Sequence, residues 1–260
     1  MRFARHITQP LRRSLAKAIY SHADDTTRAD YRELAFALLS GRPYFGNALM
    51  ARQGDPTRQR HFQPVVEQVS LKLDRPIDVL EVGSWAGSSA LAWVSAIRAS
   101  THSGALTCVD QWKAYGSVAA DMNAATDDDM IYRLFLHNIS AAGIRDFVRV
   151  VRGDSREVLK ELPAQSFDIV YIDGDHSYET VRSDIGQALR LVRSGGIACG
   201  DDLECQRHEM SNACYETAIS RDADYVTLDG NSFHPGVTRA VAEQFGRVPA
   251  WDGFWAVTMS

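Results

Sequence analysis

The segment from Ile77 to Trp93, IDVLEVGSWAGSSALAW, constrains the fold of this chain more than any other part of it. It opens with a short apolar run that has the composition of a parallel strand covered on both faces. Gly83 and Gly87 then bracket a turn, and the residues from Ser88 onward have helical character. A buried strand that passes through a glycine turn into a helix holds the nucleotide cofactor in doubly wound α/β proteins. The sequence therefore predicts such a pocket at this turn.

The residues around the turn indicate which cofactor to expect. The turn itself, GSWAG, does not have the G-x-G-x-x-G spacing of a dinucleotide site. Glu81 lies near the end of the strand, where a carboxylate repels a pyrophosphate but accepts hydrogen bonds from an ammonium group or from ribose hydroxyls. S-adenosylmethionine offers both kinds of donor, and we expect it to be the cofactor.

The composition limits the class of protein and its partners. The chain has 260 residues, of which 45% are apolar and 23% charged, as in an ordinary globular protein with one α/β core and an appendage. A net charge of −5 argues against nucleic acid as a general partner. No apolar run approaches the roughly 20 residues that span a bilayer. The four cysteines lack C-x-x-C spacing, which favours reduced thiols and a cytoplasmic location.

Residues 1–75 are expected to form an N-terminal helical cap that includes a helix over Ala29–Leu39. The first twenty residues carry five basic side chains and no acidic one, so they form a solvated helix face, a membrane-surface helix or a transit peptide. The helical spacing of Leu11, Leu15 and Ile19 favours the solvated helix, with its apolar side buried. Because such a stripe commonly packs against a second subunit, we expect a homodimer or a larger homo-oligomer.

From residue 76 to residue 260, strand-like and helix-like segments alternate, which predicts an α/β fold with a doubly wound, seven-stranded Rossmann-like sheet. The expected strands are Ile77–Val82, Ala105–Asp110, Phe147–Val151, Phe167–Ile172, Gly196–Gly200, Asp224–Leu228 and Phe254–Thr258. The expected helices are Ser88–Arg98, Asp129–Ala141, Arg156–Glu161, Tyr178–Val192, Arg207–Ser220 and Val237–Phe245.

Ligands of such sheets bind beyond the carboxyl ends of the strands, so polar residues at those ends are candidates for the site. Asp110 closes the second expected strand, where its carboxylate can accept both ribose hydroxyls of a nucleoside or can cap a turn. Asp154 and Ser155 follow the third strand. They are placed either to bond an adenine ring or to cap the next helix, and the sequence favours neither alternative.

The ends of the fourth and fifth strands are unusually acidic. The first carries Asp173, Asp175 and His176, and the second carries Asp201 and Asp202. Five ionisable groups at one rim repel one another unless a cation binds among them, and carboxylates alone suit Mg²⁺, Mn²⁺ or Ca²⁺ rather than zinc. We expect a metal site here. The alternative is that the doublet caps a helix while Asp175 pairs with His176.

Residues 77–258 resemble the metal-dependent O-methyltransferases of the macrocin and novobiocin type, which are class I methyltransferases distantly similar to catechol O-methyltransferase. The segments that carry the resemblance are VLEVGSWAGSSAL, VDQW, IDGDHSYETVRSDI, GGIACGDD and PGVTRAVAEQF. The resemblance implies a class I methyltransferase core over residues 76–260. It also implies a metal held by Asp173, Asp201 and Asp202, and a cofactor held by Glu81, Gly83, Ser88 and Asp110, with Asp154 and Ser155 at its adenine.

The catalytic base is where this sequence departs from the catechol-type pattern. That pattern has a lysine three residues after the first metal aspartate, and His176 stands at this position here. Histidine titrates near neutral pH and can take a proton from a hydroxyl group. Asp173 is the second candidate, because macrocin-type enzymes are thought to use this aspartate both as ligand and as base. His208 is a weaker third candidate.

These residues predict a methyl transfer from S-adenosylmethionine, assisted by Mg²⁺ or a similar cation, to a hydroxyl of a sugar or phenolic small molecule. The segment around Phe233 and a lid that contains Tyr44 and Phe45 are expected to form the acceptor pocket, although each aromatic can equally be a packing residue. The alternatives are a metallohydrolase built on the acidic rim and a non-catalytic cofactor-binding protein.

Overall fold

A computed structural model describes residues 25–52, 54–100, 103–113, 125–221 and 223–260. Its described residues form two compact units. The first comprises the described residues within Met1–Gly54, Ser84–Leu91 and Trp112–Val148, and the second comprises those within Asp55–Gly83, Ala92–Gln111 and Arg149–Ser260. Residues 55–75, expected in the N-terminal cap, lie in the unit that contains the sheet. The division into a cap over residues 1–75 and a core over residues 76–260 stays a prediction. The basic N-terminal segment lies outside the described residues.

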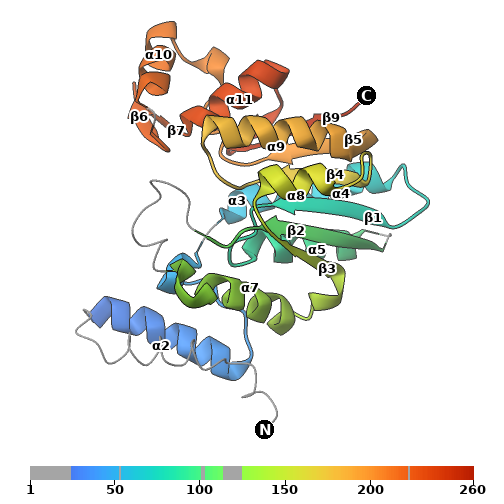
Figure 1. Cartoon of the computed structure of the whole chain (residues 1–260), viewed down its shortest axis with the longest axis vertical. Helices are drawn as coiled ribbons and strands as arrows, with labels where there is room; N and C mark the ends of the chain where they lie inside the picture. Colours follow the sequence, from blue (N-terminus) through green and yellow to red (C-terminus); the bar gives the residue numbers. More distant parts are fainter. Residues whose placement is uncertain (1–24, 53, 101–102, 114–124, 222) are drawn as a thin grey trace. The chain divides into compact units, whose positions relative to one another are not determined.

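The second unit is built on a seven-stranded sheet with the order β3-β2-β1-β4-β5-β9-β8 (Figure 1). Strands β2, β1, β4 and β5 pair in parallel, and β9 pairs antiparallel with both β5 and the edge strand β8. The strands are β1 (Ile77–Val82), β2 (Gly104–Asp110), β3 (Val148–Arg152), β4 (Phe167–Ile172), β5 (Val192–Gly200), β8 (Ala250–Trp251) and β9 (Phe254–Thr258). The predicted Rossmann-like fold class is thereby confirmed.

Alternate residues of the central strands face two separate layers, because successive side chains of a strand point to opposite faces. On β4, Val170 and Ile172 join a core with Val181 and Ile185 of helix α9 (Tyr178–Leu191). The intervening Tyr171 instead points to the other face, where its ring centroid lies 5.1 Å from that of Phe62. Both faces of the parallel sheet are therefore buried, as its continuous apolar strands predict.

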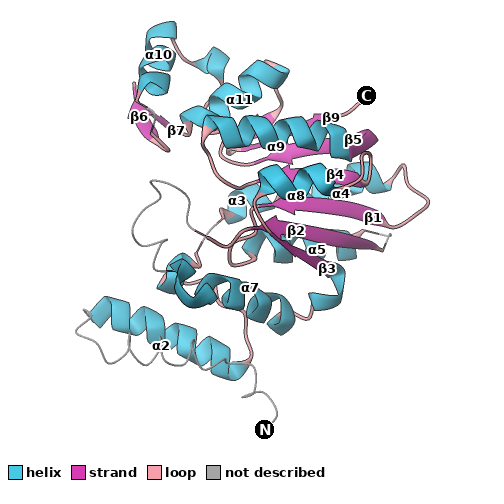
Figure 2. Ribbon diagram, in the orientation of Figure 1, coloured by secondary structure: helices cyan, strands magenta, loops and turns pink. Residues whose placement is uncertain are grey.

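Helices cover the two faces of this sheet (Figure 2). On one side lie α8 (Ser155–Glu161), α9 and α11 (Pro235–Phe245), and α11 packs along α9. On the other side, Phe62 of α4 (Phe62–Ser70) stacks on Trp93 of α5 (Ser88–Ala99), with ring centroids 3.9 Å apart. A four-residue helix, α3 (Pro56–Gln59), precedes α4 and has Asp55 as its N-cap. The helix α3 is important because it carries Arg58.

One expected strand does not join the sheet. The segment expected over Asp224–Leu228 forms only β6 (Val226–Leu228), which pairs with β7 (Asn231–Phe233) in a separate two-stranded sheet. A turn at Asp229 and Gly230, both with positive φ, closes this hairpin onto itself. The seventh strand of the main sheet is instead β8, whose two residues are too few for a recognisable pattern. The expected helix over Arg207–Ser220 is also split, into η5 (Arg207–Glu209) and α10 (Asn212–Ser220).

The first unit contains α2 (Asp25–Ser40), η2 (Ala48–Met50), η3 (Asp127–Asp129), α7 (Met130–Ala141) and η4 (Arg145–Phe147). A buried amide joins its segments: Asn138 of α7 accepts a hydrogen bond from the backbone of Tyr44 and donates to the carbonyl groups of Tyr44 and Ala86. Gly87 has a φ of +90°, and a Cβ there would lie 3.0 Å from the ring of Phe135. Glycine is therefore needed at this turn for packing as well as for conformation.

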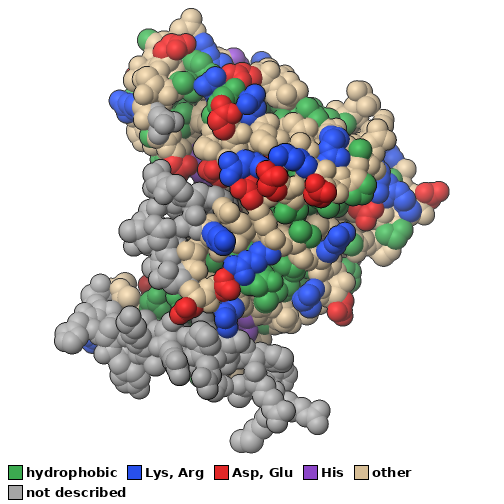
Figure 3. All heavy atoms as spheres, viewed as in Figure 1, with side chains coloured by type: hydrophobic (Ala, Val, Ile, Leu, Met, Phe, Trp, Pro, Cys, Tyr) green, Lys and Arg blue, Asp and Glu red, His purple; other side chains and the backbone are tan. Residues whose placement is uncertain are grey.

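On the face drawn in Figure 3, acidic and basic side chains lie close together over α8 and α9, so this face has no large patch of one charge. Many of these charges pair within one or two helical turns, as Lys160 does with Glu157 and Arg182 does with Glu179. None of the helices in the described part of the chain is long and apolar enough to cross a membrane.

Candidate active site

The acidic residues after β4 and β5 converge at one edge of the sheet. Asp173 directly follows β4, and Asp201 and Asp202 directly follow its parallel neighbour β5. The hydroxyl of Tyr171 lies 3.0 Å from Asp173 Oδ2 and 3.4 Å from Asp201 Oδ2, so it donates its proton between these two carboxylates. Tyr171 reaches them because it lies two residues before Asp173, and such residues share one face of a strand. The sequence predicts this convergence correctly.

Arg58 enters the same cluster from α3. Its Nη1 lies 2.9 Å from Asp201 Oδ1 and 2.6 Å from Asp202 Oδ1, and its Nη2 lies 2.9 Å from Glu204 Oε1. Its Nε donates to the backbone carbonyl of Asp252 at 2.8 Å, which fixes the plane of the guanidinium. One arginine therefore neutralises part of the charge of three carboxylates. The sequence gives no signal for this contact, because Arg58 lies more than 140 residues away along the chain from the acids it binds.

Two histidines reach the cluster on its other side. His176 Nε2 lies 3.0 Å from Asp202 Oδ2, and its Nδ1 lies 3.1 Å from Asp224 Oδ1. His234, which immediately precedes α11, places its Nδ1 3.2 Å from both carboxylate oxygens of Glu204. Of these residues, sequence reasoning assigned His176 to the site and overlooked Asp224 and Glu204. His234 directly follows Phe233, in the segment that the sequence predicts to form part of the acceptor pocket.

The surroundings of the three acids shift their pKa values in opposite directions. Burial, with the neighbouring charges of Asp201 and Asp202, raises the pKa of Asp173 well above its ordinary value. Burial and the charge of Asp202 likewise raise the pKa of Asp201 to about 7. Burial also acts on Asp202, but the hydrogen bond and charge of His176 outweigh it and lower the pKa of Asp202. Asp202 is therefore the carboxylate that keeps its charge.

The surroundings of His176 favour the protonated form of its imidazole. Burial alone lowers the pKa of an imidazole, but the hydrogen bonds to Asp202 and Asp224 raise the pKa of His176 well above its ordinary value. A protonated imidazole cannot accept a proton, and the same holds for a protonated Asp173. The role of either residue as catalytic base therefore stays a prediction.

Two other residues expected near the site have local roles. The carboxylate of Asp175 accepts hydrogen bonds from the backbone and hydroxyl of Ser177 and from the hydroxyl of Thr180, at 2.9 to 3.0 Å. It thus organises the start of α9 and does not pair with His176. His208, the third candidate for the base, is exposed on η5.

The residues expected to hold the cofactor lie along β1 and β2. Glu81 is fully buried one residue before the end of β1, and the thiol of Cys108 donates to its Oε2 at 3.3 Å. Asp110 is the last residue of β2 and is 6% exposed. Gly83 has a φ of +87°, and a Cβ there would lie 2.0 Å from the carbonyl oxygen of Asp173. The glycine is therefore required by the backbone that follows β4, and Ser88 begins α5 beyond the turn.

Asp154 has the capping role that the sequence left open. It is the N-cap of α8, accepts a hydrogen bond from the backbone of Arg156 at 3.0 Å and pairs with the side chain of Arg156. Ser155 donates to Asp184 Oδ2 at 3.1 Å. A contact of Asp154 or Ser155 with adenine stays a prediction.

Two aromatics that were expected to close the acceptor pocket are packing residues. Tyr44 is 3% exposed and its hydroxyl accepts a hydrogen bond from the backbone of Ala48. Phe233 is 1% exposed and belongs to a small core with Cys205 and Val226. Neither ring offers a surface to a ligand in this structure. Trp112, expected as an apolar wall of the cofactor pocket, is fully buried and donates to the carbonyl of Trp85 at 2.7 Å.

Comparison with known proteins relates this fold and site to methyltransferases. A family model described as a methyltransferase domain matches residues 80–203, which run from β1 to just beyond the Asp201–Asp202 doublet. A catechol O-methyltransferase from Mycobacterium tuberculosis is 33% identical over 121 residues, which cover 45% of this chain and 50% of that protein. The chain thus matches about half the length of this relative.

Two solved structures are similar over nearly the whole chain. A putative O-methyltransferase from Klebsiella pneumoniae has a TM-score of 0.54 and 17% identity, with 95% of this chain and 94% of that chain covered. A putative caffeoyl-CoA O-methyltransferase from Staphylococcus aureus has a TM-score of 0.52 and 12% identity, with 95% and 97% covered. At these identities the likeness concerns the fold, which is that of the class I methyltransferases. Within this fold, residues 80–203 match a methyltransferase domain.

Proposed function

We propose that this chain is an S-adenosylmethionine-dependent O-methyltransferase that acts on a hydroxyl group of a sugar or phenolic small molecule with the help of a divalent cation. The observation that carries the proposal is the convergence of Asp173, Asp201 and Asp202 at the carboxyl ends of two neighbouring strands of a class I methyltransferase fold. The matched methyltransferase domain covers these strand ends, and one curated relative is a catechol O-methyltransferase.

The chain offers suitable partners for the cofactor, which supplies a reactive methyl group on its sulfonium. Glu81 and Asp110 place two buried carboxylates on the adjacent strands β1 and β2. Carboxylates accept hydrogen bonds from hydroxyl and ammonium groups, so Asp110 would bind the ribose and Glu81 an ammonium or hydroxyl donor. Gly83, Ser88, Asp154 and Ser155 complete the proposed cofactor set.

The carboxylate cluster fits a hard divalent cation in the chemistry of its donors, which are all oxygens. Asp173, Asp201 and Asp202 would hold it, and Arg58 would have to release the Oδ1 atoms of the doublet, to which its Nη1 now donates. A cation bound there stabilises negative charge on an acceptor oxygen. Neutralising the cluster would also lower the pKa of Asp173, which prepares this carboxylate to take the hydroxyl proton, with His176 as the second candidate base.

The test is a methyl-transfer assay with labelled S-adenosylmethionine and a panel of catechols, other phenols and sugars, each with Mg²⁺ and with EDTA. The proposal predicts transfer to at least one hydroxyl compound, lost in EDTA and restored by Mg²⁺. Hydrolysis of an ester or phosphate substrate without any need for S-adenosylmethionine would favour a metallohydrolase. Nucleoside binding without transfer to any acceptor, unaffected by metal, would favour a binding protein. Either result would contradict the proposal.

We also propose that the enzyme works in the cytoplasm as a homodimer or larger homo-oligomer. The cytoplasmic location is supported by the four free, buried cysteines of the chain, which suit a reducing compartment. Sedimentation of the purified full chain would test the oligomeric state, and a monomer at micromolar concentration would contradict a homodimer or larger homo-oligomer.

A further inference from the structure

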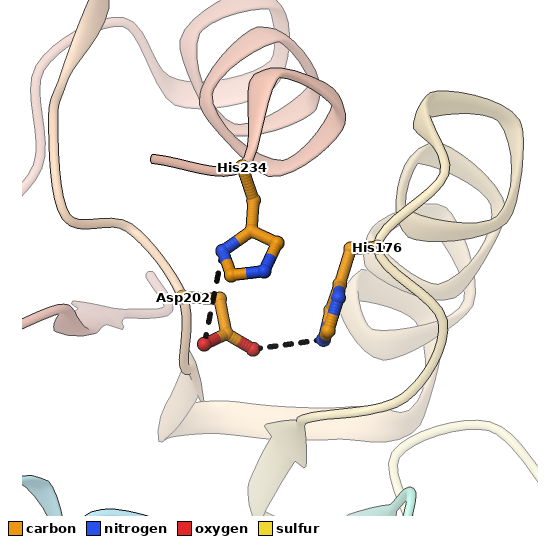
Figure 4. A group of neighbouring side chains, drawn as sticks. All are labelled: His176, Asp202 and His234. Carbon is orange, nitrogen blue, oxygen red and sulfur yellow. Dashed lines mark ion pairs between the residues drawn. The ribbon is translucent and has the colours of Figure 1, made fainter. Parts of the chain in front are cut away.

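Two histidines and one carboxylate meet at the carboxyl edge of the sheet (Figure 4). His176 follows β4, Asp202 follows β5 and His234 precedes α11, so three segments far apart in the sequence supply one side chain each. One ligand atom from each residue lies within 4.8 Å of the corresponding atoms of the other two. The histidine rings lie 4.2 Å apart between centroids. All three side chains are largely covered, with exposed fractions of 29%, 15% and 12%.

Each histidine has an acidic partner on its Nδ1 atom, and the Nδ1 of His234 also lies 3.9 Å from Asp202 Oδ1. Asp224 Oδ1 lies 3.1 Å from Nδ1 of His176, and Glu204 lies 3.2 Å from Nδ1 of His234. Histidines that bind metals in proteins are oriented in this way, because a carboxylate on one ring nitrogen fixes the ring and makes the other nitrogen a better ligand. The Nε2 atom of His176 then faces Asp202, and in Figure 4 the second ring nitrogen of His234 lies on the side of His176.

The two oxygens of Asp202 face different neighbours. Oδ1 lies 2.6 Å from Arg58 Nη1, on the side of Asp201. Oδ2 lies 3.0 Å from His176 Nε2, and His234 Nδ1 lies 3.9 Å from Oδ1. Each oxygen of Asp202 therefore has one of the two imidazoles near it, and Oδ1 also contacts the guanidinium of Arg58. Arg58 donates to Oδ1 and leaves Oδ2 to His176.

We propose that His176, Asp202 and His234 form a binding site for a first-row divalent transition metal such as Co²⁺, Zn²⁺, Ni²⁺ or Fe²⁺. Two imidazole nitrogens and one carboxylate oxygen suit these ions, whereas Mg²⁺ prefers oxygen ligands alone. Asp202 is the one residue that this site shares with the cation set of the proposed function. The site does not depend on methyltransferase activity. When His176 binds a metal it cannot serve as a base, so the same ions would inhibit any turnover that uses this imidazole.

The test is a calorimetric titration of the full chain with Co²⁺ after removal of metals with EDTA and dialysis, followed in parallel by visible absorption. We expect one Co²⁺ per chain. His234→Ala should weaken the affinity at least about tenfold, and Asp224→Asn, which alters only the outer partner of His176, should weaken it by about 10-fold to 100-fold. His208→Ala, at an exposed histidine outside the group, is the matched control and should leave the affinity unchanged.

Asp173→Asn separates this proposal from the proposed function. It removes a ligand of the carboxylate cluster and should abolish Mg²⁺-dependent methyl transfer, but it should leave the Co²⁺ affinity within about threefold because Asp173 is not in the histidine group. Absence of Co²⁺ binding at millimolar concentration would overturn the proposal. So would binding that survives both His234→Ala and Asp224→Asn, or binding that is lost in Asp173→Asn.

Discussion

The Nη1 atom of Arg58 lies 2.6 Å from Oδ1 of Asp202, at the centre of the acidic cluster after β4 and β5. A guanidinium therefore contacts the same carboxylate oxygens that a divalent cation would need. The side chains of Arg58 and Asp202 are each 15% exposed, so water solvates the charge of neither group fully. Their pairing makes binding of a cation to the Asp201–Asp202 doublet a competition with an internal positive charge.

This competition predicts the behaviour of Arg58→Gln. Without a cation, the variant leaves the carboxylates of Asp201, Asp202 and Glu204 short of a partner, and we expect a loss of up to about 3–5 kcal/mol in the free energy of unfolding. Mg²⁺ should raise the midpoint of thermal unfolding more in the variant than in the wild type. Arg60→Gln is the matched control, because Arg60 pairs with the exposed Asp252 outside the cluster. If Mg²⁺ raised the midpoint of thermal unfolding equally in the wild type and in Arg58→Gln, the proposed competition between Arg58 and the cation would be contradicted.

Gly83→Ala tests the close approach of β1 to the segment after β4. The added methyl group would lie 2.0 Å from the carbonyl oxygen of Asp173, at a φ of +87°. We expect the free energy of unfolding to fall by more than about 2 kcal/mol, because both the clash and the backbone conformation are unfavourable for alanine. Gly195→Ala is the control, since it shares a positive φ of +79° but has open space around the new methyl group. Chemical denaturation of both variants measures the difference, and equal losses would show that the clash is relieved.

Asp184 predicts a pH dependence of stability. Burial, opposed by the hydrogen bond from Ser155, raises the pKa of Asp184 from 3.8 to about 7. A carboxyl group whose pKa is higher in the folded state favours the protonated form there, so its ionisation destabilises the fold increasingly between about pH 4 and pH 7 and fully above that.

The variant Asp184→Asn should therefore be close to the wild type at pH 4 and more stable at pH 8. The difference at pH 8 is at most about 4 kcal/mol by the conversion of a pKa shift into free energy. Urea denaturation at both pH values checks this prediction. A stability difference that does not change with pH would mean that the fold does not raise the pKa of Asp184 and would contradict the prediction.

Asp173→Asn tests whether Asp173 serves the cation and the acceptor hydroxyl and does not bind the cofactor. The amide has nearly the shape of the protonated carboxyl and can still accept the hydrogen bond from Tyr171. We expect methyl transfer to fall at least about 100-fold, because both a cation ligand and a candidate base are removed. The affinity for S-adenosylhomocysteine should stay within about threefold. Loss of cofactor binding in a folded variant would reverse the assignment.

The sequence predicted the central part of the fold because its signals are local. The apolar runs of β1 and β4 and the glycine turn at Gly83 depend on neighbouring residues only, and parallel pairing then brings the ends of β4 and β5 together. The segment that forms β6 was wrongly predicted to join the main sheet, because a three-residue strand has the same local pattern in either sheet.

The charge partners of the site could not be predicted in the same way. Arg58 approaches from α3, and Asp224 and Glu204 bind the histidines through contacts that span about 30 or more residues of sequence. No periodicity marks such contacts, because they depend on how helices and loops pack on the finished sheet. Asp175 is the opposite case, since its offset of two residues from Ser177 is the local signature of a turn that precedes a helix.

The most direct test of the account is a calorimetric titration of the full chain with S-adenosylhomocysteine in EDTA. The account predicts one site per chain that needs no metal, and a loss of about 1–3 kcal/mol of binding free energy in Asp110→Ala through the missing hydrogen bonds to the ribose. An exposed acid, Asp146, provides the control variant Asp146→Ala, which should bind as the wild type does. No binding by the wild type at millimolar ligand, or equal binding by Asp110→Ala, would contradict the account.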